Sequence, residues 1–358
     1  MALVKLAVVG AGAMGAKHAE LVRAHEACRL VGVCDADPNR RGAADACGVP
    51  FHRCVEELIE REEPDGIIIA TPNAEHACVA EICAASSVHI LVEKPVADTI
   101  EQAQRIIAAS RRCGIAVLVG HHRRHNPLVQ KARELVHRGE LGELVGVSVL
   151  WALLKPDEYF ETAWRRERPG GGPLLINLIH ELDTLRFICG DVDSVFAQTS
   201  SKTRDLVVED SLSISLNFKN GALGTLLASD ATAAPWSYEA STCENPMYYH
   251  AAENCCHFLG TSGSLAFPRM ELWRYGNKAQ RGWCQPMECE RIEVERADPL
   301  KLQLAHFCRV VRGEEEPLVN AEEGTRSLAL TLAVGESGER GAPVNPSTLL
   351  PGGRPANR

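Results

Sequence analysis

Over the first third of the chain, short runs of consecutive apolar residues alternate with stretches whose apolar residues recur at a helical period. The runs are rich in β-branched residues and do not alternate with polar ones, which is typical of strands covered on both faces. Such strands, separated by helices, predict a doubly wound parallel sheet. The expected strands are 3–9, 30–34, 66–70, 89–92 and 116–119, and the expected helices are 15–24, 55–61, 75–85 and 100–112.

After residue 122 the pattern changes. Residues 208–218 and 223–229 flank a turn, and the first of them alternates polar and apolar side chains. This arrangement predicts an antiparallel hairpin with one solvated face. We therefore expect an α/β protein in which the parallel sheet is followed by an α+β domain with a large, mostly antiparallel open sheet. Further strands are expected at 258–259, 265–267 and 272–275, and helices at 127–136, 173–188, 300–312 and 322–335.

Composition narrows the class of protein. Hydrophobic residues make up 45% and charged residues 24%, which is globular composition, and the net charge of −9 argues against nucleic acid or an anionic membrane as partner. We see no apolar run long enough to cross a bilayer and expect a cytoplasmic protein. The 14 cysteines form no CxxC pair, so we expect reduced thiols and no metal site.

Three glycines mark a nucleotide-binding turn. Gly10, Gly12 and Gly15 form a GxGxxG motif, with Ala13 and Met14 between the last two, at the junction of an expected strand and helix. The first glycine makes the turn, the second lets the backbone approach a pyrophosphate, and the third allows close packing of helix on strand. The motif in this context predicts a bound dinucleotide.

A carboxylate at the end of the second expected strand bears on which dinucleotide is bound. Asp35 can accept hydrogen bonds from the ribose hydroxyls and repel a 2′-phosphate, which favours NAD. Arg40 and Arg41 follow and could reach a phosphate, so NADP stays open.

Polar residues also follow the next two expected strands. Thr71–Pro72–Asn73 comes after 66–70, and Glu93–Lys94–Pro95 comes after 89–92, both at the carboxyl edge where ligands gather. Lys94 could stabilise the alkoxide-like state that develops as hydride leaves, and Pro95 could hold the loop in a cis conformation. The alternatives are a turn that begins a helix and a plain surface loop.

Four groups of residues then follow one another in the order found in a known family: Gly10–Ala11–Gly12–Ala13–Met14–Gly15, Thr71–Pro72–Asn73 with His76, Glu93–Lys94–Pro95, and Gly170–Gly171–Gly172 leading to His180 and Asp183. Together they resemble the Gfo/Idh/MocA family of dehydrogenases. The resemblance implies an NAD(P)-binding Rossmann domain over residues 1–122 and an α/β substrate-binding and oligomerisation domain over 123–340. We expect a flexible tail over 341–358, small polar substrates such as sugars, inositols and polyols, and a homodimer or homotetramer.

The resemblance also implies catalytic roles. Lys94 corresponds to the family's catalytic lysine and His180 to its acid/base histidine. The family commonly has an aspartate four residues before this histidine, where this chain has Ile176. Asn177 is adjacent, but one residue turns a helix by about 100°. Either His180 works with Lys94 alone or another group completes the relay; a purely structural pairing of His180 with Asp183 is the alternative.

Binding residues are implied in the same way. The cofactor would contact the glycine motif, Asp35, Thr71–Pro72–Asn73, His76, Glu93, Lys94 and Arg123, and the substrate would contact Lys94, Trp164, Arg165, Asn177 and His180. Arg123 lies in the loop 120–124, where a histidine metal site or a solvated arginine pair are the alternatives. Arg165 could bind a carboxylate or hydroxyls bidentately, or Trp164 could be a loop anchor. The irregular run 236–250 is expected to form a lid or an oligomer contact.

The leading hypothesis is hydride transfer between NAD(P) and the hydroxyl or carbonyl carbon of a sugar, inositol, polyol or related hydroxy acid. A second hypothesis is a redox-neutral NAD-dependent hydrolase or lyase on the same fold, which would form product without net reduced nicotinamide. A third is a non-catalytic dinucleotide-sensing regulator, which would bind nicotinamide without turnover.

Overall fold

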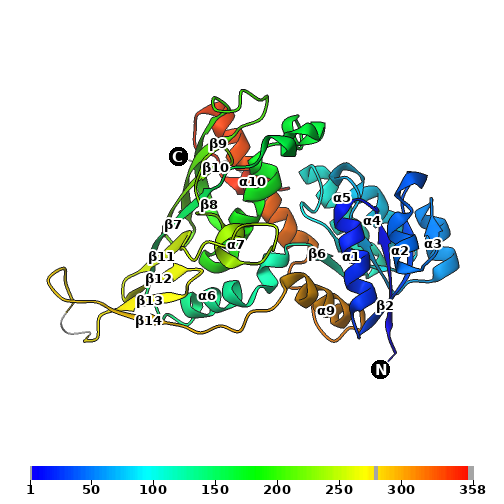
Figure 1. The fold of residues 1–358 in the computed structure, drawn as a ribbon, viewed down its shortest axis with the longest axis horizontal. Coiled ribbons are helices and arrows are strands. Elements are labelled where there is room, and N and C mark those ends of the chain that lie inside the picture. The colour runs from blue at the N-terminus through cyan, green and yellow to red at the C-terminus, as the bar shows by residue number, and fades with distance from the viewer. Residues whose placement is uncertain (1, 278–280, 354–358) are drawn as a thin grey trace. The chain divides into compact units, whose positions relative to one another are not determined.

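The computed structural model describes residues 2–277 and 281–353 of the chain. It divides into two compact units, one formed by Met1–His125 with Ala297–Leu328 and the other by Asn126–Arg296 with Ala329–Arg358 (Figure 1). The first unit therefore includes Ala297–Leu328, which the expected domain boundary at residue 122 assigned to the second domain. Each unit is described by itself below.

The N-terminal unit is built on a parallel sheet. Six strands pair in the order β3-β2-β1-β4-β5-β6 within the described residues, and every pair is parallel. This confirms the doubly wound sheet. The strands are β1 Val4–Val9, β2 Cys28–Cys34, β3 Phe51–His52, β4 Gly66–Ile69, β5 His89–Val92 and β6 Val117–Val119, and the helices are α1 Ala13–Ala24, α2 Gly42–Cys47, α3 Val55–Glu62, α4 His76–Ala85 and α5 Ile100–Cys113.

Local sequence explains where these elements begin and end. All four residues of β4 are buried, as expected for a strand covered on both faces. Helix α5 begins at Thr99, whose side chain accepts a hydrogen bond from the Gln102 N–H. It ends at Gly114, which adopts a left-handed conformation with φ 68° that costs glycine little.

Helix α9 (Pro299–Val311) belongs to the N-terminal unit because its apolar face packs there. Asp298 caps its first turn, and Phe307 is fully buried. The helix packs against α1 and against the short helix η3 (His122–His125). The next helix, α10 (Ala321–Arg340), begins in this unit and ends in the other.

The C-terminal unit is built on a large open sheet. Eight strands of the described chain pair in the order β14-β13-β12-β11-β7-β10-β9-β8, and every pair is antiparallel except β10 with β7. This confirms the mostly antiparallel sheet. The strands are β7 Leu144–Ala152, β8 Val192–Ser200, β9 Ser211–Phe218, β10 Leu223–Ser229, β11 Cys256–Gly260, β12 Gly263–Phe267, β13 Glu271–Arg274 and β14 Glu288–Arg291.

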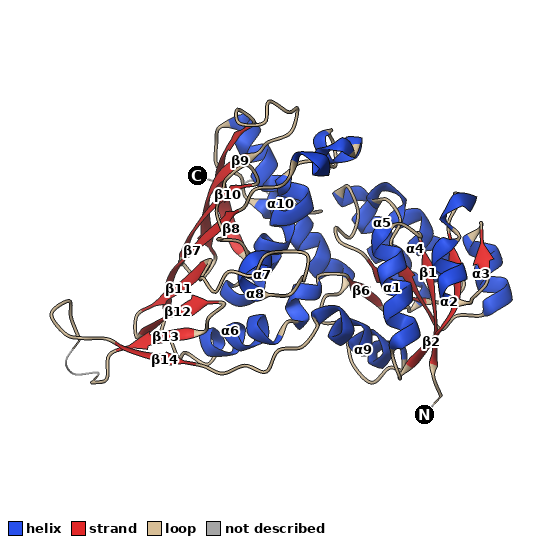
Figure 2. Cartoon of the chain, in the orientation of Figure 1, coloured by secondary structure: helices blue, strands red, loops and turns tan. Residues whose placement is uncertain are grey.

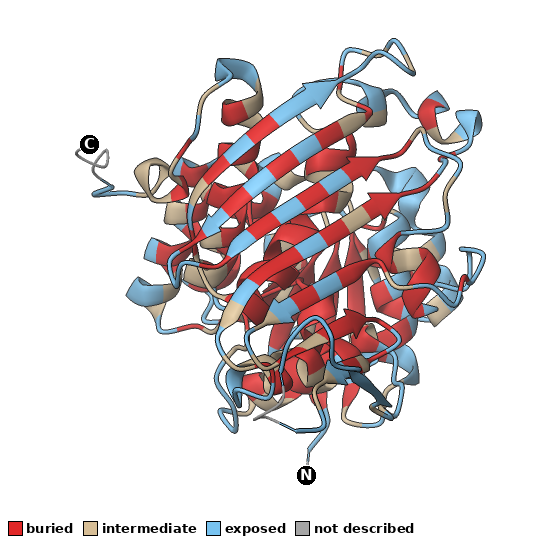
Figure 3. Ribbon diagram, turned by 90° about the vertical axis from the view of Figure 1, so that its left-hand side faces the viewer, coloured by how far each residue is buried: buried red, intermediate tan, exposed pale blue. Residues whose placement is uncertain are grey.

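Helices lie on one face of this sheet and leave the other uncovered (Figures 2 and 3). Burial alternates residue by residue along β9 and β10, so one face packs and the other meets solvent. The exposed face carries Leu223 and Leu227, which are 63% and 56% exposed. The helices are α6 Pro127–His137, α7 Ile179–Cys189 and α8 Tyr238–Thr242, with the second part of α10.

Two expectations for this unit need correction. Within the run 236–250, α8 is buried and the Tyr238 hydroxyl lies 2.5 Å from Glu244, so Tyr238–Thr242 is core. Residues 245–250 are exposed, and for them a lid or an oligomer contact stays a prediction. The described part of the expected tail is anchored, because Val344 pairs with Val195 and Pro346–Leu349 forms a short helix. Residues 354–358 of that tail lie outside the described residues.

Two further observations concern the cysteines and the helices of the described residues. All 14 cysteines lie among the described residues, and all are free thiols. No helix in the described ranges is both long and apolar enough to cross a membrane.

Candidate active site

The glycine motif forms a tight turn that is open at one point. A Cβ added to Gly15 would lie 1.7 Å from the Gly10 carbonyl oxygen, and one added to Gly10 would lie 2.5 Å from the Ala70 backbone. A Cβ added to Gly12 would meet nothing within 4 Å. The outer glycines are therefore required by packing, whereas the space beside Gly12 is what a pyrophosphate would need.

The first turn of α1 suits an anion. Its N-cap, Gly12, supplies no side-chain hydrogen bond, and the turn holds no acidic residue. The helix N–H groups are thus left for a ligand, where the helix dipole favours negative charge. Ala13 and Met14 are exposed at this turn. The donor set fits the phosphates of a dinucleotide.

Asp35 ties the glycine loop to the end of β2. Its carboxylate accepts hydrogen bonds from the backbone N–H of Ala11 at 2.7 Å and of Asp37 at 2.9 Å. A carboxylate has about four lone-pair sites, so it keeps acceptor capacity for ribose hydroxyls. Its position fits the predicted role.

A buried ion pair holds the loop that carries Lys94. Oε1 of Glu93 lies 2.7 Å from Nε2 of His18 on α1, and Oε2 accepts the backbone N–H of Lys94 at 3.1 Å. Burial raises the pKa of Glu93, but the His18 hydrogen bond and charge, with the charges of Lys94 and His122, lower it to about 2. Glu93 is therefore an ionised anchor for the loop, and Lys94 beside it is half-buried.

His76 joins the two predicted loops. Its ring nitrogens lie 3.1 Å from the carbonyl oxygens of Thr71 and Pro95, so the ends of β4 and β5 are linked through one side chain. Burial lowers the pKa of His76, whereas its hydrogen bonds to the backbone of Thr71 and Pro95 raise it. Asn73 begins a short helix directly after Pro72, and the Lys94–Pro95 peptide is cis. His76 thus links the two loops through its ring, and its contact with the cofactor stays a prediction.

The loop after β6 is packed and not solvated. Arg123 and Arg124 are 3% and 4% exposed, so the solvated-pair alternative is wrong. Arg124 lies 3.3 Å from Glu323 at the start of α10. His125 packs its ring 5.2 Å from that of His306, and burial, followed by nearby positive charges, lowers the pKa of His125 to about 3.

In the C-terminal unit, His180 follows an unusual turn. Leu174–Leu178 forms a π-helical turn that runs into α7, and His180 lies buried in the first turn of α7 with Asp183 beyond it. The wider turn alters the spacing before His180 that a regular helix would give. Asn177 lies in this turn, and its side-chain oxygen accepts a hydrogen bond from Nζ of Lys155 at 2.7 Å.

Trp164 and Arg165 lie in a short helix before the glycine triplet. Trp164 is exposed, whereas Arg165 stacks over the Tyr159 ring at 4.1 Å and donates from Nη1 to the Tyr159 carbonyl at 3.0 Å. A Cβ on Gly171 would lie 2.7 Å from the Arg165 carbonyl oxygen, so glycine allows this close approach. The structure thus holds Arg165 beside the start of the helix that carries Asn177.

Two family models match the chain. One, described as an oxidoreductase family with an NAD-binding Rossmann fold, matches residues 4–121, and the GFO/IDH/MocA C-terminal domain matches residues 129–266. Together the matches span well over half of the 358 residues. The chain belongs to the Gfo/Idh/MocA family. It is an NAD(P)-dependent oxidoreductase with the fold expected from its motifs.

Relatives span most of this family member. It is 27% identical over 302 residues to the 1,5-anhydro-D-fructose reductase of Ensifer adhaerens, covering 83% of this chain and 84% of the relative. It is 25% identical to the D-apiose dehydrogenase of Paraburkholderia graminis, covering 96% and 90%. A crystal structure of an Agrobacterium radiobacter oxidoreductase in complex with NAD+, L-tartaric acid and magnesium aligns with a TM-score of 0.81 at 20% identity, covering 98% and 100%, and supports the fold.

Sequence reasoning missed two supporting residues of this Gfo/Idh/MocA member. His18 lies on the buried face of α1, three residues after Gly15, where a polar residue among Ala19 and Val22 signals a partner. Lys155 closely follows the apolar strand β7, and it is almost fully buried. Both signals are polar residues at positions that the apolar pattern assigns to the interior.

One group of described residues has the spacing of metal ligands. His25, Cys28 and Cys308 offer ligand atoms within 4.8 Å of one another, at the start of β2 and not at its carboxyl end. Nδ1 of His25 accepts the Ala27 N–H at 3.1 Å, so one of the candidate ligand atoms already has a backbone partner. Hydride transfer to nicotinamide requires none of the three, and the absence of a resident metal stays a prediction.

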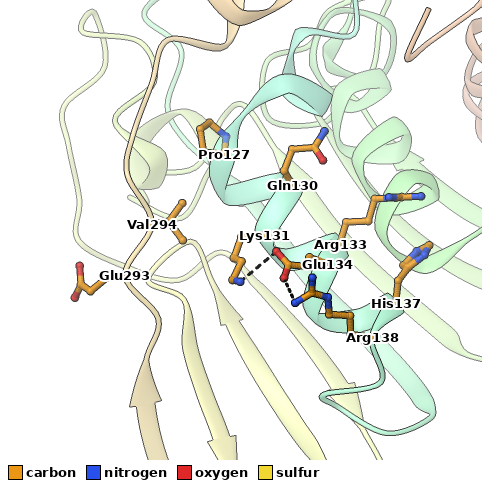
Figure 4. Close-up of a pocket in the computed structure, with 9 residues that line it drawn as sticks. All are labelled: Pro127, Gln130, Lys131, Arg133, Glu134, His137, Arg138, Glu293 and Val294. Atoms are coloured by element: carbon orange, nitrogen blue, oxygen red, sulfur yellow. Dashed lines mark hydrogen bonds and ion pairs between the residues drawn. The ribbon is translucent and has the colours of Figure 1, made fainter. Parts of the chain in front are cut away.

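A cavity of about 670 Å³ opens beside α6, away from the predicted site residues (Figure 4). Glu134 lies in its wall and bridges Lys131 at 3.1 Å and Arg138 at 2.6 Å. Because no predicted cofactor or substrate residue lines it, we assign it no part in the reaction.

Proposed function

We propose that this Gfo/Idh/MocA member transfers a hydride between NAD(P) and the CH–OH carbon of a small polar substrate, with Lys94 and His180 as the acid/base pair. The substrate classes are sugars, inositols, polyols and related hydroxy acids. Two of the relatives are named as a reductase of an anhydro-sugar and a dehydrogenase of a sugar, which supports sugar-like substrates.

The observation that carries this proposal is the anchored loop of Lys94. The buried His18–Glu93 pair and the His76 bridge hold the loop at the same edge of the sheet as the glycine motif. An ammonium group fixed there lowers the energy of an alkoxide-like oxygen. His180 accepts the hydroxyl proton, a task that suits a neutral imidazole near pH 7.

When bound, NAD(P) supplies the hydride acceptor or donor. The residues that would hold it are the glycine motif with the first turn of α1, Asp35, Thr71–Pro72–Asn73 and Arg123. Asp35 favours NAD over NADP because a carboxylate repels a 2′-phosphate. On the substrate side, Trp164, Arg165 and Asn177 supply contacts from the C-terminal unit.

The experiment follows nicotinamide absorbance while purified protein is offered NAD or NADP with a panel of sugars, inositols and hydroxy acids. We expect turnover with at least one class, faster with NAD. On that substrate, Lys94→Met should lower kcat by roughly 10²- to 10⁴-fold, the usual range for a lost acid/base group. Wild-type turnover in Lys94→Met would contradict the proposal.

We further propose that two copies of the chain pair through the uncovered face of the large sheet, giving a homodimer or a homotetramer in the cytoplasm. The support is the row of exposed apolar side chains on that face, which a lone soluble chain would leave in water. Trp273, Leu259 and Leu223 lie on neighbouring strands of this sheet, and the strand registers place them in one row.

A further inference from the structure

Three cationic side chains gather on two neighbouring aromatic rings in the C-terminal unit. Nζ of Lys155 lies 4.6 Å and Cζ of Arg165 4.1 Å from the centre of the Tyr159 ring. Arg204 lies 4.4 Å from the centre of the Phe160 ring. Aromatic faces attract cations, but they do not cancel the charge.

Among the described residues, two carboxylates form ion pairs with the three cations of this cluster. Buried Asp230 lies 3.0 Å from Nε of Arg204 and 3.4 Å from Nζ of Lys155, so two cations share it. The exposed Asp157 lies 3.7 Å from Arg204. Among the described residues no carboxylate forms an ion pair with Arg165, whose Nε is buried without a hydrogen bond. The cluster therefore has spare positive charge at Arg165.

Arg165 is held so that part of its guanidinium fork remains to bind a ligand. Within the described part of the chain, Nη1 alone has a hydrogen-bond partner, the Tyr159 carbonyl, and the Tyr159 ring fixes the plane of the guanidinium group. The Arg165 carbonyl accepts the Gly172 N–H at 3.1 Å, which ties the residue to the start of the helix that contains Asn177. A preorganised fork of this kind suits a carboxylate.

Lys155 decides which way the Asn177 amide points. An ammonium group has only donors, so the atom 2.7 Å from it must be the amide oxygen, and the NH2 group must face away. Burial lowers the pKa of Lys155, whereas the charge of Asp230 and its hydrogen bond raise it. Asn177 is half-buried, so its NH2 group is a fixed donor.

A nearby acid is occupied elsewhere. The Glu209 carboxylate accepts the backbone N–H of Leu174 at 3.0 Å at the start of the helix. Burial raises the pKa of Glu209, while its hydrogen bond with the Leu174 backbone opposes this shift. One oxygen of Glu209 is thus already committed to the start of the helix.

We infer that Arg165 and the Lys155-oriented Asn177 form a subsite for a substrate carboxylate, so that the substrate class is a sugar acid or hydroxy acid and not a neutral polyol. The inference rests on the proposed function and narrows it. Arg165 binds the carboxylate, Asn177 donates to it, and Lys155 is a positioning residue that sets the direction of the amide.

The test titrates NADH-loaded full-length protein with paired probes that differ in one carboxylate: D-glucuronate against D-glucose, and D-galacturonate against D-galactose. Calorimetry should show the acid binding at least about tenfold more tightly in each pair, as expected for a charge-assisted bidentate contact. Equal affinities within both pairs, or no binding of either acid, would overturn the inference. NADH binding, measured first in the same cell, reports separately on the proposed function.

Two variants and a control identify the residues. Arg165→Gln should abolish the preference for the acid, whereas Arg166→Gln, which removes the same charge from the next, exposed residue, should keep it. Asn177→Asp keeps the contact with Lys155 but replaces the donor by a negative oxygen, so it should weaken acid binding by about tenfold without lowering Tm. An unchanged preference in Arg165→Gln, or a matching loss in Arg166→Gln, would contradict the assignment.

Discussion

The two units use a lysine and a buried carboxylate in opposite ways. In the N-terminal unit, Glu93 is paired with His18 and holds the backbone of a loop, so that Lys94 itself remains half-buried at the edge of the sheet. In the C-terminal unit, Lys155 is almost fully buried against Asp230, and its ammonium group orients the Asn177 amide. Neighbouring groups position Lys94, whereas Lys155 positions the side chain of Asn177.

Because of this difference, different kinds of substitution should disrupt the two arrangements. The N-terminal arrangement depends on backbone geometry and one ion pair, so it should break when a glycine or a histidine changes. The C-terminal arrangement depends on side-chain direction, so it should respond to substitutions that keep shape and reverse hydrogen-bond polarity.

The largest effect is expected at Gly12. A Cβ at Gly12 meets nothing within 4 Å, and the Gly12→Val side chain is expected to fill the space beside the first turn of α1. We expect the dissociation constant for NADH to rise by roughly a hundredfold or more, about 3 kcal/mol, with little change in Tm. Fluorescence titration and a thermal melt measure both, and Gly12→Ala provides a smaller step. NADH binding at wild-type strength in Gly12→Val would place the cofactor elsewhere.

A smaller effect is expected at His18, where stability and activity should fall together. His18→Leu leaves Glu93 buried without its partner, which costs about 3–5 kcal/mol for a buried pair. Because the loop of Lys94 loses its anchor, we also expect kcat to fall. His52→Leu is the matched control, since His52 and Glu62 form a second His–Glu pair at 3.0 Å on β3, which is separated from β5 and the Lys94 loop by three strands. It should lower Tm but spare kcat; equal kcat losses in both variants would refute a positioning role.

The same pair predicts a pH dependence of stability. The pKa of Glu93 lies at about 2 in the folded chain against an ordinary 4.5, because His18 outweighs the effect of burial. A lowered carboxyl pKa stabilises the fold above the unfolded pKa, and this contribution is lost as the pH falls from 4.5 towards 2. Acid melts of His18→Leu should show a weaker dependence in this window than those of the wild type; identical slopes would exclude the pair as its source.

The smallest effect on catalysis is expected on the sheet face. Leu223→Asp with Leu227→Asp places charges on the uncovered side of β10 and should shift the protein to a smaller species in light scattering, with Tm little changed. Leu226→Asp, on the buried face of the same strand, should instead unfold it. An unchanged mass for the double variant would reject this face as the interface.

Sequence predicted the N-terminal unit better than the C-terminal one, for a physical reason. Local geometry predicts the GxGxxG turn, Asp35 and the loops after β4 and β5. Glycine packing and the ends of strands depend on residues that are close together in the sequence. The pairing of His18 with Glu93 and of Lys155 with Asn177 joins residues far apart in the chain. No local pattern encodes such contacts.

The sequence pattern did not predict the π-helical turn before His180 either. A regular helix over 173–188 was the natural prediction from spacing, whereas Leu174–Leu178 adopts a wider turn. The return of α9 to the N-terminal unit is a second case, because an amphipathic pattern shows that a helix packs but not against what.

The central claim is that Lys94 and His180 act together on one hydroxyl. The most direct measurement is a double-mutant cycle on the substrate found in the panel, with single-turnover rates of hydride transfer in wild type, Lys94→Met, His180→Gln and the double variant. Groups that act as a unit are strongly non-additive, so the double variant should be no slower than the slower single variant. Independent, multiplying losses, or a wild-type rate in either single variant, would contradict the account.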